Sequence, residues 1–192
     1  MNTRICSWKP GRKRLKSLNL FVKNNMKNLQ IPEPLLIQFD LHHRLYNNVL
    51  EGFTDEESNR RLTGFPQLNH VKYLAGHLLN SQYGIAAIAG LKPDIKWNDL
   101  FAVMGQSEAK DGFAYPSLEE IKTEWNHLHE PTLRGLKELQ ADDLNLKPPS
   151  PFDQVSENIG QLWAFISHHQ AYHIGQIGIL RRAFGKEPMS YQ

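Results

Sequence analysis

Residues 156–184 read SENIGQLWAFISHHQAYHIGQIGILRRAF, and this stretch decides the fold because its apolar side chains recur every three to four residues. At about 100° per residue, one apolar face forms within roughly 60° of Ile166. Its other members are Ile159, Leu162, Trp163, Ile177 and Leu180. The stretch ends at Gly185, a residue type that commonly terminates helices. It therefore predicts one long amphipathic helix.

Two histidines share this apolar face. His169 and His173 fall inside the apolar arc, whereas His168 points roughly 200° away from its centre. An imidazole ring in a core without partners leaves a donor and an acceptor unmet, at a cost of a few kcal/mol. The i, i+4 spacing lets both rings turn a nitrogen toward one ion, which is why HxxxH recurs in helical metal sites.

Three further segments have helical apolar periodicity, and they cover residues 33–52, 66–89 and 118–139. Short helices are expected at 54–62 and 97–104, and Pro131 is expected to kink or split the third long segment. Thr54 with Glu57 and Ser117 with Glu120 have the form of capping boxes. No stretch alternates with period two for long enough to make a strand. We therefore predict an all-α fold, an up-and-down four-helix bundle with short extra helices in the connections.

A tight metal site seldom has only two protein ligands, so a third is expected from a neighbouring helix. His77 is the leading candidate, since it lies about 60° from Leu74 at the margin of the apolar stripe of segment 66–89. His70 shares that face but lies seven residues earlier, about 10 Å away along the helix axis. We therefore predict that His77, His169 and His173 hold one divalent transition metal.

The donor set indicates the kind of metal and the kind of chemistry. Three neutral imidazoles suit Zn or Ni and are compatible with Fe or Mn. Three protein ligands leave open positions, as catalytic zinc sites do, and a water or thiol bound there becomes a nucleophile at neutral pH. We predict a metal-dependent S-transferase or hydrolase that acts on a small molecule, with no general base assigned. The alternative is a non-catalytic module with a structural or sensing metal.

Two motifs resemble a known family. HVKYLAGHL at 70–78 and HQAYHIGQI at 169–177 look like the DinB-like, YfiT-like superfamily of four-helix bundles, and the resemblance covers nearly everything from Met26 onward. It implies that His77, His169 and His173 bind a divalent metal. It also implies enzymes that use low-molecular-weight thiols, stress-related members without assigned activity, and homodimers.

Other residues near the motifs carry weaker predictions. Gly175 and Gly178 cost about 1 kcal/mol each inside a helix, so another helix backbone is expected to approach them closely. Gln176 either orients a metal ligand or makes an ordinary structural hydrogen bond. His43 and Tyr46, on the first helix, are candidates to line a cavity beside the metal.

Length and charge set the domain organisation. The 192 residues fit one domain, which we place at 31–192. Residues 1–30 hold eight basic and no acidic residues, whereas the remainder holds fourteen basic and twenty acidic ones. This leader is typical of a disordered tail; a nucleic-acid arm, an organellar transit segment and an early start codon with Met26 as the initiator are the alternatives.

Cysteine content and hydropathy indicate the cellular compartment in which the protein is expected. Cys6 is the one cysteine, so no intramolecular disulfide can form, and no run of about eighteen apolar residues exists to cross a membrane. A cytoplasmic protein without a membrane partner is therefore expected, and nucleic acid is not an expected partner.

Overall fold

The computed structural model describes residues 33–102 and 108–191, and these contain four long helices. They are α2 (Glu33–Leu50), α4 (Val71–Ile88), α6 (Leu118–Glu138) and α7 (Ile159–Ala183). The connections contain the short helices α3 (Asp55–Ser58) and α5 (Asn98–Phe101) and the 3-10 turns η2 (Asp143–Asn145) and η3 (Phe152–Gln154). No strand forms among these residues, so the predicted all-α bundle with short connecting helices is confirmed. The leader 1–30 and Met26 lie outside the described residues.

Side chains at the helix starts explain most of the boundaries. Both predicted capping boxes are present, at Thr54 before α3 and at Ser117 before α6. His70 caps the start of α4, because its ring Nδ1 accepts a hydrogen bond from the Tyr73 amide at 3.0 Å. Pro131 lies inside α6, and the helix continues through it without a break.

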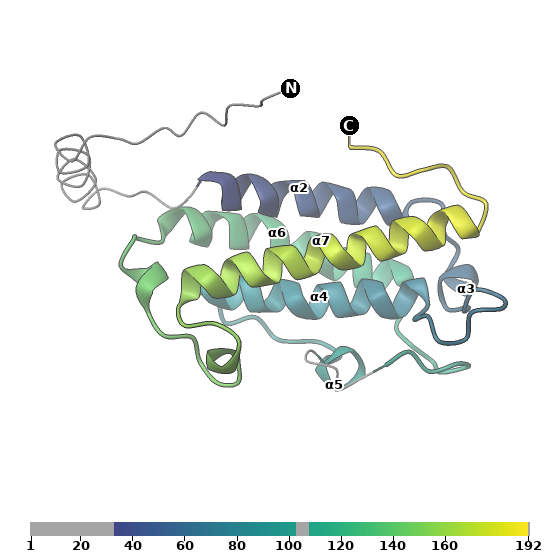
Figure 1. Ribbon diagram of the computed structural model, residues 1–192, viewed down its shortest axis with the longest axis horizontal. Coiled ribbons are helices and arrows are strands. Elements are labelled where there is room, and N and C mark those ends of the chain that lie inside the picture. Colours follow the sequence, from purple (N-terminus) through teal and green to yellow (C-terminus); the bar gives the residue numbers. More distant parts are fainter. Residues whose placement is uncertain (1–32, 103–107, 192) are drawn as a thin grey trace, which may run out of the picture.

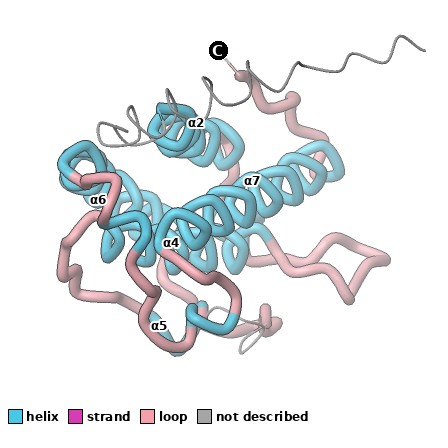
Figure 2. The backbone as a smooth tube through the Cα atoms, turned by 60° about the vertical axis from the view of Figure 1, so that its left-hand side comes forward, coloured by secondary structure: helices cyan, strands magenta, loops and turns pink. Residues whose placement is uncertain are grey.

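The four long helices follow the cyclic order α2, α6, α4, α7 around the bundle (Figure 2). Helices α4 and α6 run in the same direction. At their starts, the Asp55 carboxylate binds both the Lys72 ammonium and the Leu118 amide, and at their ends Gly135 packs against Ala89. Helices α2 and α7 run the opposite way (Figure 1). The order of directions is therefore up, down, down, up, which differs from the strict alternation of a simple up-and-down bundle.

The long connection between α4 and α6 explains this order. It returns along the whole of α4, with Asn98 bonded to Asn80 at 2.9 Å, the Phe101 ring against Gly76, and the Ala109 amide bonded to the Asn69 side chain at 3.2 Å. Helix α6 consequently starts at the same end of the bundle as α4. The connection also covers the side of α4 that carries His77.

Apolar side chains from all four long helices fill the interior. Trp125 and Tyr46 stack at the centre of the larger core cluster with a ring separation of 4.0 Å, and Trp163 lies in the smaller cluster. All three rings are completely buried, which agrees with the large area that aromatic side chains contribute to small bundles. Within the described ranges, no helix combines the length and the hydropathy that a bilayer crossing requires.

Candidate metal centre

His77 lies near the middle of α4, where it is buried with 8% of its surface exposed. Its ring stacks on Tyr73, one turn earlier, with 6.0 Å between the centroids. Its Nδ1 is 3.3 Å from the carbonyl oxygen of Phe101. The ring is therefore oriented by a neighbour on its own helix and by the α5 segment of the long connection.

His169 and His173 lie one turn apart on α7, and both are half-buried. The sequence predicted them at the centre of the core-facing stripe, but the structure places Ser167, Gln170 and Ile174 there. The two histidines lie at the edge of that stripe, on the side that faces α4. This position leaves one side of each ring next to a cavity.

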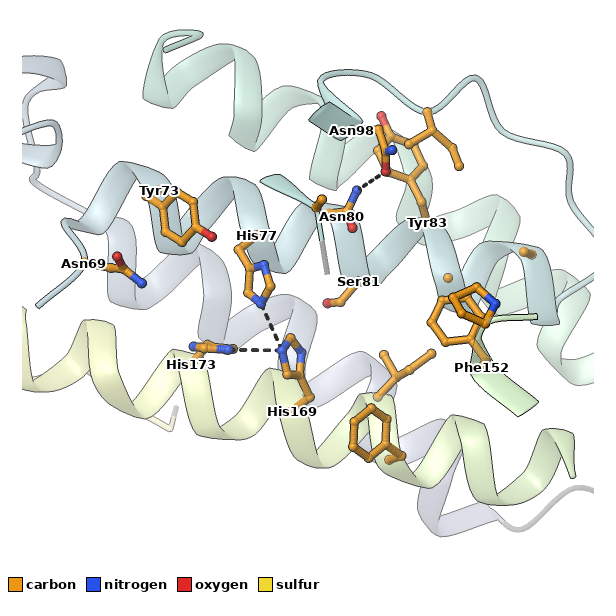
Figure 3. A pocket seen from close by; sticks show the side chains of 17 residues that line it. Asn69, Tyr73, His77, Asn80, Ser81, Tyr83, Asn98, Phe152, His169 and His173 are labelled. Atoms are coloured by element: carbon orange, nitrogen blue, oxygen red, sulfur yellow. Dashed lines mark hydrogen bonds between the residues drawn. The ribbon is translucent and has the colours of Figure 1, made fainter. Parts of the chain in front are cut away.

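The three rings converge on one point (Figure 3). The Nε2 atom of His169 is 3.0 Å from the Nε2 of His77 and 3.0 Å from the Nε2 of His173. One nitrogen from each ring lies within 4.8 Å of the other two. Among the described residues this is the group of histidines, cysteines and carboxylates whose spacing suits a metal ion.

The hydrogen-bond pattern around the rings tests whether a cation fits. A carbonyl oxygen only accepts, so the Nδ1 of His77 carries the proton and its Nε2 has a lone pair. The side-chain oxygen of Gln176, 2.6 Å from the Nδ1 of His173, indicates the same form for that ring. Both lone pairs face the Nε2 of His169, which has at most one proton to donate. Protons therefore cannot satisfy both contacts, whereas a shared divalent cation satisfies all three nitrogens.

Burial keeps the three imidazoles neutral. It is the largest of the causes that together lower the pKa of His77 to about 4 and the pKa of His169 to about 3, and the neighbouring imidazoles are another of these causes. Burial also lowers the pKa of His173, against an opposing effect of its hydrogen bond to Gln176. At neutral pH each ring is thus in the form that metal ions bind.

Gln176 belongs to the surroundings of the cluster. Its side-chain oxygen faces the Nδ1 of His173, and its amide nitrogen donates to the Tyr172 hydroxyl at 3.0 Å. Groups in this position fix the orientation and the tautomer of a histidine ligand. Of the two roles considered for Gln176, the geometry favours orienting His173.

His43 and Tyr46 do not reach the cluster. Tyr46 is buried between α2, α4 and α6, where its hydroxyl donates to the Ala75 carbonyl at 3.2 Å. His43 stacks on His129 of α6 with 3.7 Å between the centroids. Neither residue lines the cavity beside the three histidines, so the prediction that they do is wrong. Both rings stack on side chains of α6, Tyr46 on Trp125 and His43 on His129.

The glycine prediction is only partly supported. A Cβ on Gly175 would meet nothing within 4 Å, so no backbone approaches this residue. A Cβ on Gly178 would lie 3.2 Å from the Met189 sulfur and 3.9 Å from Val49 of α2. The closest helical approach is instead at Gly76, where a Cβ would lie 2.3 Å from the Phe101 ring.

A cavity of about 610 Å³ opens beside the three histidines, between α4, α7 and the α5 segment. Sequence reasoning missed the part of its wall that comes from connections without helical periodicity, which includes Ile95, Ala102 and Phe152. It also missed Gln170, which is fully buried and donates to the Gln82 side chain at 2.9 Å. The signal for Gln170 was its position between the two histidines, on the face that the apolar stripe defines.

A model of the DinB superfamily matches residues 38–177, which include most of α2 and α7 and all three histidines of the cluster. The chain belongs to the DinB superfamily. The match confirms the resemblance seen in the two histidine motifs of this DinB-like chain, and it extends well beyond those motifs. A comparison with curated proteins gives no match.

Proposed function

We propose that this DinB-like protein is a metal-dependent enzyme in which His77, His169 and His173 hold one divalent ion that activates a thiol or a water molecule. The observation that carries the proposal is the convergence of three imidazole nitrogens at the wall of a cavity of about 610 Å³. A purely structural ion does not require such a cavity, and pockets of this size suit small-molecule ligands.

The ion would supply one property, a lowered pKa for a thiol or water that coordinates it. The protein supplies the rest. Phe101 and Gln176 fix the rings of His77 and His173, so that the ligand nitrogens are oriented before the ion binds. In thiol transfer the sulfur forms a bond to the electrophilic carbon while the leaving group departs with its electron pair. No carboxylate lines the described part of the cavity, so the thiol proton goes to solvent water.

Zinc or nickel is the metal that we favour, because three neutral nitrogen donors suit both ions, and iron or manganese would also fit the donors. The small-molecule substrate is a thiol or the target of an activated water. Pairing into a homodimer stays a prediction from the family resemblance.

The test compares two adjacent histidines of α7. His169→Ala removes a member of the cluster, whereas His168→Ala is the matched control, since His168 is exposed. Elemental analysis of the purified full-length chain should find one equivalent of metal in the parent and the control but not in His169→Ala. Consumption of thiols with an electrophile should follow the metal content.

Two results would count against catalysis. One is a parent protein that carries metal but consumes neither a thiol nor a hydrolysable ester beyond the metal-free rate. The other is loss of the helical circular dichroism signal when a chelator removes the ion, which would support the alternative of a structural metal.

A further inference from the structure

The cavity has two chemically different ends. One end holds the three histidines and the Tyr73 ring (Figure 3). The other end is formed by Ala87, Ile95 and Phe152, while the Phe165 ring lies beside His169, with 6.4 Å between the two centroids. Ala87 lies ten residues after His77 on α4, which corresponds to about 15 Å along the helix axis. A ligand with its head at the histidines therefore has room for an extended body against apolar side chains.

The walls offer no charged partner to that body. None of the described residues that line the cavity is Asp, Glu, Lys or Arg. The polar amides of Asn80 and Asn98 bind each other at 2.9 Å.

The nearby charges at Lys96 and Glu124 are already paired. The Lys96 ammonium is 2.6 Å from the Glu124 carboxylate, which also accepts a hydrogen bond from the Tyr83 hydroxyl at 2.9 Å. Tyr83 lines the cavity with its ring, while its hydroxyl turns to Glu124. This network contributes an apolar surface to the cavity and leaves no unpaired ammonium for an anionic ligand.

From these walls we infer the substrate class: a molecule with one metal-binding head and an uncharged, apolar body. The inference rests on the proposed function, because the head is the thiol or other group that meets the ion. A divalent ion with three neutral ligands attracts an anionic head that coordinates it, but a carboxylate on the body, away from the ion, would lose its hydration without gaining a cationic partner in the wall. The site therefore discriminates against thiols that carry several carboxylates.

The rim of the cavity supports the same class. Ile95 and Phe165 are large apolar side chains with 49% and 42% of their surface exposed. Both line the cavity, so an apolar body that binds there would cover them. The area removed from water stabilises the complex in proportion to its apolar part.

The test uses two probes that differ by one carboxylate, 2-naphthylmethanethiol and its 6-carboxy derivative. The full-length protein is loaded with cobalt, so that thiolate-to-metal absorption reports the head and naphthalene emission reports the body. We expect the uncharged probe to bind at least tenfold more tightly. Equal affinities, or tighter binding of the carboxylate, would overturn the inference.

A positive charge in the cavity wall should reduce the preference for the uncharged probe over the carboxylated one. Ile95→Arg puts a cation at the apolar end, on a connection and at an exposed position where the fold tolerates it. The carboxylated probe should then gain at least tenfold in affinity. Ile179→Arg is the control, because Ile179 is 71% exposed on α7 and does not line the cavity. A gain of the same size in both variants would overturn the inference, since it would reflect net charge alone.

Metal-free protein separates this inference from the proposed function. If the protein fails to bind a metal, the absorption signal is absent and the proposed function fails. Naphthalene emission still reports binding of the two probes to the cavity. A preference for the uncharged probe in metal-free protein, reversed or removed by Ile95→Arg, would support the apolar class of ligand, and the lack of any preference would reject it.

Discussion

At the residue scale, the three-histidine cluster depends on side chains that hydrogen-bond to a histidine ring through the nitrogen that does not face the metal site. Gln176 is the clearest of them, since its oxygen is 2.6 Å from the Nδ1 of His173. Gln176→Leu should weaken metal affinity about 10-fold to 100-fold, the usual effect of losing such a partner. Competition with a chromogenic chelator would measure it. Gln67→Leu, at an exposed position away from the cluster, is the control and should leave the affinity unchanged.

A second histidine group gives a pH dependence. Burial and the neighbouring His129 lower the pKa of His43 to about 4, from 6.5 in the unfolded chain. The unfolded chain therefore takes up the proton first, and stability falls as the pH drops below 6.5 and levels off below about 4. In metal-free protein, His43→Phe keeps an aromatic ring beside His129 and removes this titration.

Thermal melts at pH 7 and pH 5 would measure the effect. The difference in melting temperature between the two pH values should be smaller in His43→Phe than in the parent. His127→Gln, at an exposed position of α6, should retain the full difference. An unchanged difference in His43→Phe would contradict the assignment of the acid sensitivity to His43.

At the element scale, two glycines inside helices should respond in opposite ways to alanine. Gly76→Ala would push a methyl group into the Phe101 ring, and such overpacking costs about 1–3 kcal/mol. Gly175→Ala has open space and should gain up to about 1 kcal/mol of helix stability. Urea unfolding would measure both, and Gly76→Ala should cost much less in a Phe101→Ala background than in the parent if the Phe101 contact is the cause.

The sequence predicted the long helices and the residues of the histidine cluster, but not the contacts that the connections make with them. Helical periodicity predicted the four long helices, and the motifs around His77 and His169 identified the residues that the structure brings together. The contact between Gly76 and Phe101 could not be predicted, because it joins a helix to a connection without a periodic pattern. His43 was misplaced because a helical wheel gives the direction of a side chain but not the helix that it will face.

At the scale of the whole molecule, the four helices and the cluster lie within residues 33–191. A chain that begins at Met26 should therefore melt at the same temperature as the full chain and retain its metal. Differential scanning calorimetry and elemental analysis would check this. A lower melting temperature would mean that residues 1–25 contribute to the fold.

The four long helices and the long connection between α4 and α6 contribute different parts of the site. Helices α4 and α7 position the three imidazoles. The long connection supplies Ile95 and Asn98 to the cavity wall and does not cross the core. Substitutions around Ile95, away from Phe101, whose carbonyl orients His77, can therefore change which molecules bind in the cavity without disturbing the ion. Such a separation would let one scaffold acquire new ligands during evolution while its inorganic chemistry stays constant.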